Sequence, residues 1–211
     1  MKVKISLENV LPGEIEKRSF EIITQMLGEK KLKIENEQVI KRVIHTTADF
    51  DYADNLCFSP GAVKIFEQAL REGACIVTDT QMAKAGINKK SLARFGGEVF
   101  CFMSDEDVAH KAKENGTTRA SASMDKALNL QCPLIFAIGN APTALIRLYE
   151  LIKEEAISPK LIVGVPVGFV NVIQSKELIM QSGVPYIVAK GRKGGSNVAA
   201  AICNAVLYSI K

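Results

Sequence analysis

His45 is the residue of this chain that most clearly suggests chemistry, because the chain has only two histidines. It ends the apolar run of "KRVIHTTADFDYADN", and three carboxylates follow within nine positions. An imidazole can give or accept a proton near neutral pH, so His45 is a candidate general acid. The carboxylates are expected to cap and orient a turn, and Asp49 would act on the imidazole if that turn folded back. His110 lies in a charged segment and is expected to face solvent.

A glycine-rich segment near the end of the chain predicts an anion site. "AKGRKGGSNVAAA" follows an apolar strand and opens a helix, and Gly194 and Gly195 allow close approach of the backbone to a ligand. Ser196 is expected to cap the helix, whose first N–H groups attract negative charge. Lys190 and Arg192 add positive charge beside it. A solvated turn before the last helix is the alternative interpretation.

Two further segments place polar groups at expected element ends. "GTTRASASM" puts Thr118 and Arg119 at a helix start, and the guanidinium fork of arginine matches a carboxylate. An ordinary surface arginine is an equally good interpretation of that segment. Gly139 and Asn140 end the apolar strand of "PLIFAIGN", and ligands of parallel-sheet folds bind outside such strand ends.

Ser19 stands out because of its place in a predicted helix over residues 14–27. Apolar residues recur there at helical spacing, and Ser19 falls on the same face as Ile15, Ile22, Ile23 and Met26. A hydroxyl on such a face needs a partner. The alternative is a small residue that permits close packing of the helix.

Short apolar strands alternate with helices from residue 74 onwards, in the order expected for a parallel sheet. Five such strand–turn–helix units follow one another, and no linker divides them. The pattern predicts an α/β fold, with residues 1–211 as a single domain built on a mainly parallel twisted sheet with helices on both faces. The residues at the strand ends are then the candidates for ligand binding.

Composition limits the function classes. The 211 residues are 47% hydrophobic and 24% charged, and the net charge of +4 is scattered, which argues against a nucleic-acid partner. The five cysteines form no CxxC pair, so no metal site is expected. Their spacing also predicts free thiols in a reducing compartment, the cytoplasm. No apolar window is long enough for a membrane span. The chain has neither a GxGxxG fingerprint nor a P-loop, which argues against a nicotinamide cofactor or a nucleotide.

Taken together, six motifs resemble the precorrin-8X methylmutase family. They are "RSFEII", "VIHTTADFDYADNLCFSPGA", "GTTRASAS", "AIGNAPTAL", "GVPVGFVNVIQSKE" and "GRKGGSNVAAA", which occur in the family's order between about residues 12 and 205. The pairing of "AIGNAPTAL" with "GVPVGFV…SKE" is highly specific, whereas the first eleven residues carry no family signal.

The resemblance implies an isomerase of corrin biosynthesis. Members move a methyl group from C-11 to C-12 of precorrin-8 or its cobalt complex, giving hydrogenobyrinic or cobyrinic acid. It also implies that no cofactor is needed and that a homodimer holds the active sites near its interface. The family's active-site histidine matches His45, and its substrate-contacting serine matches Ser19.

Two rival interpretations remain open at this point. A non-catalytic tetrapyrrole carrier would use the same anion loops without needing the histidine. A dehydrogenase-like nucleotide binder is the other, and the absent glycine fingerprint argues against it.

Overall fold

The computed structural model describes residues 7–210, which form an α/β fold around one six-stranded sheet. The strand order is β1-β6-β5-β4-β2-β3, and all neighbours are parallel except β1, which runs antiparallel to β6 at one edge. The predicted mainly parallel sheet is therefore confirmed. Its strands are β1 (Leu56–Phe58), β2 (Cys75–Thr78), β3 (Val99–Phe100), β4 (Leu134–Ile138), β5 (Leu161–Gly164) and β6 (Tyr186–Ala189).

Both faces of the sheet are buried, which explains why its strands are continuous apolar runs. In β4, Ile135 and Ala137 belong to one core cluster, while Leu134, Phe136 and Ile138 belong to the other. Successive side chains of a strand point to opposite faces, so each face needs its own layer of helices.

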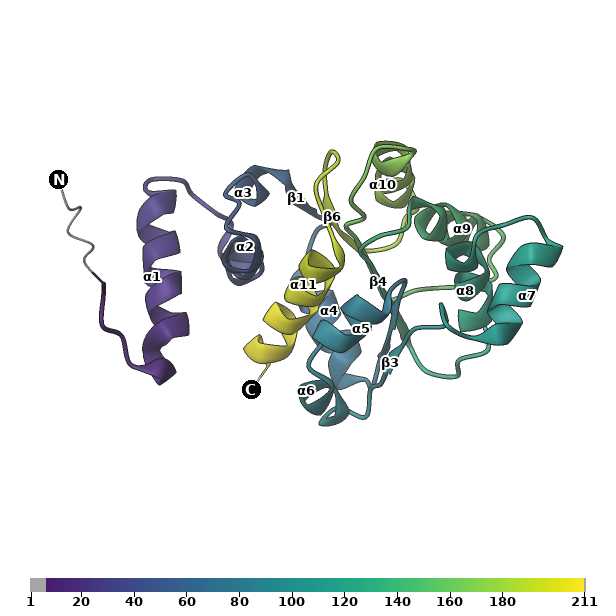
Figure 1. Ribbon diagram of the computed structural model, residues 1–211, viewed down its shortest axis with the longest axis horizontal. Helices are drawn as coiled ribbons and strands as arrows, with labels where there is room; N and C mark the ends of the chain where they lie inside the picture. The colour runs from purple at the N-terminus through teal and green to yellow at the C-terminus, as the bar shows by residue number, and fades with distance from the viewer. Residues whose placement is uncertain (1–6, 211) are drawn as a thin grey trace.

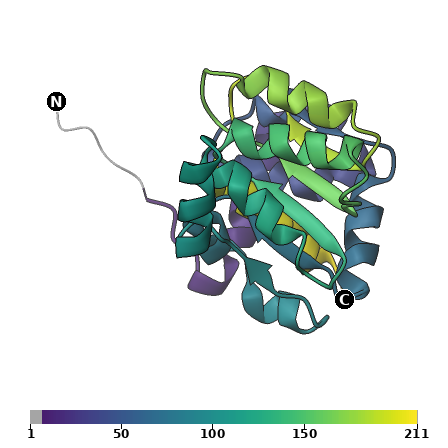
Figure 2. The same cartoon turned by 90° about the vertical axis from the view of Figure 1, so that its right-hand side faces the viewer.

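The two helical layers differ in make-up (Figures 1 and 2). One core cluster joins the sheet to α2 (Ile34–Thr47), α4 (Ala62–Arg71), α6 (Lys89–Ala93) and α11 (Ser196–Ser209). Helix α5 (Gln81–Gly86) packs on α11. The other core cluster joins the sheet to α8 (Arg119–Ala127), α9 (Pro142–Lys153) and α10 (Val172–Met180), with α7 (Glu106–Glu114) packed on α8. The short α3 (Tyr52–Asn55) leads into β1.

Helix α1 (Ile15–Leu27), preceded by the 3₁₀ turn η1 (Pro12–Glu14), confirms the helix predicted over residues 14–27. It lies at one end of the molecule and packs on α2 (Figure 1). The predicted apolar face is only partly covered: Ile23 is buried, but Ile15 and Met26 are 53% and 65% exposed. Ile15 and Met26 stay exposed because α2, which packs on α1, covers only part of that face.

The ends of the predicted domain, residues 1–6 and 211, lie outside the described residues. Within residues 7–210, no helix combines the length and the apolar character that crossing a membrane requires.

Candidate active site

Three of the predicted segments meet at the carboxyl edge of the sheet. Asp79 and Thr80 follow β2, Gly139 and Asn140 follow β4, and the loop of residues 190–195 follows β6. Strands β2 and β4 are neighbours, but the chain leaves β2 towards β3 on one side and leaves β4 towards β5 on the other. This is a topological switch point, the place where open α/β sheets bind ligands.

Glycines permit the close contacts between these segments. A Cβ at Gly139 would lie 2.7 Å from the Cα of Ser196, and a Cβ at Gly194 would lie 2.0 Å from the carbonyl oxygen of Val165. The Gly195 amide donates to that same oxygen at 2.9 Å. The close backbone approach predicted for the glycine loop is thus present, but it is to the protein's own backbone.

Ser196 does not cap α11, contrary to the prediction. The helix begins at Ser196 itself, and the residue before it is Gly195, with φ 142°, a conformation that favours glycine. The Ser196 hydroxyl instead lies 2.8 Å from that of Thr80 on the neighbouring segment. Ser196 therefore ties the start of α11 to the end of β2.

Asp79 accepts hydrogen bonds from the backbone amides that follow β4. Its buried carboxylate accepts hydrogen bonds from the N–H groups of Gly139, Asn140 and Ala141 at 2.9, 2.8 and 2.6 Å. Burial raises the pKa of Asp79, and the three amides oppose that rise. The backbone of Gly139 and Asn140 is consequently not free to bind a substrate anion, whereas the exposed side chain of Asn140 is.

His45 is exposed in the last turn of α2. The turn that the sequence predicts after His45 begins slightly later, because the helix continues to Thr47 and is capped by Ala48 in the left-handed conformation. The imidazole stacks on Phe20 of α1, with ring centroids 5.4 Å apart and planes 24° from parallel. Its side chain makes no hydrogen bond to the rest of residues 7–210, so its polar atoms are available to a ligand.

Side chains of α1 and α2 around His45 include Arg42, Glu16 and Ser19. Arg42 lies over the Phe20 ring at 4.9 Å and pairs with Glu16 at 2.8 Å, and this hydrogen bond lowers the pKa of Glu16. Ser19 is half-buried, and its hydroxyl donates to the Ile15 carbonyl one turn earlier at 2.9 Å. The partner that the hydroxyl needs is therefore in its own helix, and a role in substrate contact stays a prediction.

The carboxylates after His45 connect α2 to the glycine loop. Asp49 accepts from the Asp51 amide at 3.0 Å, which orients the turn as expected. Lys193 Nζ lies 2.6 Å from a carboxylate oxygen of each aspartate. The lysine lowers the pKa of Asp49, mainly through this hydrogen bond. Asp49 therefore faces Lys193 of the loop.

Thr118 and Arg119 lie at the start of α8, as predicted. The Thr118 hydroxyl caps the helix by accepting from the Ser121 amide at 3.1 Å, and it lies 2.8 Å from the hydroxyl of Thr143 in the first turn of α9. Arg119 is exposed and unpaired among the described residues. The start of α8 is thus joined to the segment that follows β4.

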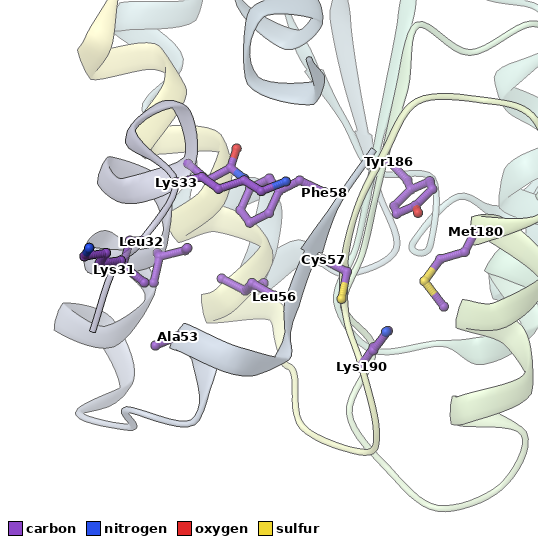
Figure 3. A pocket seen from close by; sticks show the side chains of 12 residues that line it. Lys31, Leu32, Lys33, Ala53, Leu56, Cys57, Phe58, Met180, Tyr186 and Lys190 are labelled. Carbon is purple, nitrogen blue, oxygen red and sulfur yellow. The ribbon is translucent and has the colours of Figure 1, made fainter. Parts of the chain in front are cut away.

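Lys190 and Arg192 are both exposed, but they face different surroundings. Lys190 lines a cavity of about 430 Å³ that wraps around β1, with Lys31 and Lys33 on the other side of the strand (Figure 3). Arg192 lies over the ring of Phe169 at 6.0 Å. The structure does not bring these two cations together at one point.

Sequence reasoning gave no role to Phe20, and it singled out Asp79 only as a residue at a strand end. Phe20 is part of the "RSFEII" motif, which was the only signal for it. Asp79 stands at a strand end, but nothing in the sequence tells that its carboxylate reaches amides sixty positions away. Among residues 7–210, no group of three or more His, Cys, Asp or Glu side chains is placed to hold a metal ion.

Comparison with known proteins gives matches over nearly the whole chain. The family described as precorrin-8X methylmutase matches residues 14–209. The cobalt-precorrin-8 methylmutases of Salmonella typhimurium and Priestia megaterium are 47% and 45% identical, over 95% and 93% of this chain and 96% and 88% of theirs. A crystal structure of precorrin-8x methyl mutase from Thermus thermophilus superposes with a TM-score of 0.84 at 38% identity, covering 92% of this chain and 96% of that one. The chain therefore belongs to the precorrin-8X methylmutase family, whose members are isomerases of cobalamin biosynthesis.

Proposed function

We propose that the protein moves the methyl group from C-11 to C-12 of precorrin-8X or cobalt-precorrin-8, giving hydrogenobyrinic or cobyrinic acid. The family match over residues 14–209 is the observation that carries this proposal. The relatives described above, at 45% and 47% identity, act by name on the cobalt form. Cobalt-precorrin-8 is therefore the substrate we expect to be turned over faster.

His45 is the proposed proton donor. A [1,5]-sigmatropic shift produces no net change of charge, so it needs neither a nucleophile nor a metal ion. One proton held on or near the conjugated system is sufficient to favour migration of the methyl group. A positioned general acid of this kind typically contributes about 10²–10⁴-fold in rate. The exposed imidazole, fixed by stacking on Phe20 and free of protein hydrogen bonds among the described residues, supports this role.

The acetate and propionate groups of the macrocycle are proposed to contact several separate points. Lys190, Arg192 and Arg119 are exposed cations near the carboxyl edge of the sheet. Asn140 follows β4 and Ser196 begins α11 at the same edge. Thr118 and the glycines Gly139, Gly194 and Gly195 shape the backbone there. Binding spread over many contacts suits a large polycarboxylate.

We also propose that the protein works in the cytoplasm as a homodimer with its active sites near the interface. His45 is exposed in the single chain, whereas general acid catalysis on an apolar macrocycle benefits from exclusion of water. Along α1 and the segment before it, the side chains of Leu11, Ile15 and Met26 are 68%, 53% and 65% exposed. A second copy that covers α1 would bury these apolar groups and enclose His45 and Ser19.

The test of the activity is the absorption spectrum after the purified protein is mixed with precorrin-8X, or with cobalt-precorrin-8. The methyl shift changes the conjugation, so turnover appears directly as a spectral change. Conversion of at least one substrate is expected, with the cobalt form faster. Binding of both without any spectral change would instead indicate a carrier and would refute the proposed activity.

A further inference from the structure

Three successive carbonyl groups of the glycine loop accept hydrogen bonds from the rest of the protein. The oxygens of Gly191 and Lys193 accept hydrogen bonds from the side-chain Nζ of Lys176 on α10, at 2.8 and 2.9 Å. The oxygen of Arg192 between them accepts from the Gly168 amide at 3.2 Å. Three successive peptide groups of the loop are therefore fixed in orientation.

This orientation leaves three amides unused. The chain has no cis peptide bond among its described residues, and in a trans peptide the C=O and the following N–H point in opposite directions. The N–H groups of Arg192, Lys193 and Gly194 therefore point away from Lys176 and Gly168. Within residues 7–210 none of them donates to a protein acceptor. Successive free amides of this kind form a concave site for an anion.

Lys176 is an unusual residue for packing alone. It is 1% exposed, although lysine normally keeps its ammonium group in water. No carboxylate of the described residues lies within ion-pairing distance of it. Burying a charge without a counter-charge is costly, and methionine would fill a similar volume without that cost. The two loop carbonyls are the compensation that the structure provides.

We propose that Lys176 is a positioning residue that turns the carbonyls of Gly191 and Lys193 inward and so presents the amides of Arg192 and Gly194 to one carboxylate of the tetrapyrrole. The Lys193 amide between them is oriented by the hydrogen bond from Gly168 to the Arg192 carbonyl. Its positive charge, behind the loop, adds attraction for that carboxylate. This inference rests on the proposed role of the glycine loop in substrate binding. It assigns to Lys176 of the "SKE" motif on α10 a function that needs no contact with the substrate.

Substitution of Lys176 by methionine tests the proposal. We expect cobyrinic acid, used as the binding probe, to bind at least about tenfold more weakly, because a charge and two hydrogen bonds that orient the site are lost. Once substrate is bound at saturation, the single-turnover rate should stay within about threefold of the wild type. Lys176→Arg should recover part of the affinity. Lys113→Met, on the exposed side of α7, is the matched control and should change neither quantity.

Hydrogen exchange in the wild-type protein provides a second test that needs no variant. The amides of Arg192, Lys193 and Gly194 should exchange quickly in the free protein and at least about tenfold more slowly with cobyrinic acid bound. Unchanged exchange of all three on binding would overturn the proposal. So would a folded Lys176→Met variant with a lower melting temperature but normal affinity, since that result assigns the lysine to stability alone.

A double variant distinguishes failure of this inference from failure of the proposed substrate site at the glycine loop. Replacing Lys190 and Arg192 together by glutamine should also weaken cobyrinic acid binding if the loop contacts substrate. Normal affinity in that variant, with weak binding by Lys176→Met, would refute the cation contacts of the proposed function. Weak binding in that variant, with normal affinity in Lys176→Met, would refute the positioning role.

Discussion

Replacing Asp79 by asparagine should destabilise the protein substantially while leaving its shape almost unchanged. The carboxylate accepts three amide hydrogen bonds from residues 139–141 in a buried setting. A carboxamide has one oxygen, which can accept two of them, and its NH₂ group would face the third N–H. One buried amide is then unsatisfied, which costs about 1–3 kcal/mol, and the other two bonds lose their charge assistance.

Part of this loss is offset because asparagine is less costly to bury than a carboxylate. We therefore expect the free energy of unfolding to fall by about 3 kcal/mol in total. Urea denaturation at pH 7, followed by circular dichroism, measures it. Asp54→Asn is the control, because its carboxylate is 67% exposed and pairs with Lys30 at the surface, so its loss should stay below about 0.5 kcal/mol. If Asp79→Asn is as stable as this control, the three hydrogen bonds do not hold the turn after β4.

Three further predictions concern single side chains. Arg119→Ala should raise the dissociation constant of the substrate about tenfold and leave the single-turnover rate unchanged, because a carboxylate clamp acts equally on ground and transition states; an altered rate at normal affinity would contradict the role. Ser19→Val should keep the melting temperature within about 2 °C but weaken binding about tenfold; normal affinity would return Ser19 to packing. Burial lowers the pKa of Lys176 from 10.5 to about 8, so between these pH values the unfolded chain binds more protons. The stability of the wild type relative to Lys176→Met should therefore rise from pH 8 to pH 10.5, by up to about 3 kcal/mol; a difference that stays flat would refute this.

The fold was largely predictable because buried parallel strands have a strong pattern. The runs around Ile76, Ile135, Ile162 and Ile187 are apolar on both faces, and each is followed by a turn and a helix. The antiparallel strand β1 has only three residues, and its pairing with β6 joins segments more than 120 positions apart. Short strands of this kind carry too little local signal to be assigned from the sequence.

The close backbone contacts at the sheet edge were predictable from the glycines, but the partners in those contacts were not. Gly194 and Gly139 indicated close backbone contacts, and these exist. Their partners, Val165 and Ser196, are set by tertiary packing that the sequence does not display. The cap expected from Ser196 failed for the same reason, since the Thr80 hydroxyl offered a contact from a distant segment.

The central claim is that His45 supplies the proton for the methyl shift, and single-turnover conversion of cobalt-precorrin-8 by His45→Ala tests it most directly. The variant should remain folded by circular dichroism, because the His45 side chain is exposed and the contact it would lose is its stacking on Phe20. It should bind substrate with affinity close to that of the wild type and convert it about 10²–10⁴-fold more slowly. Conversion by the folded variant at the wild-type rate would contradict the account.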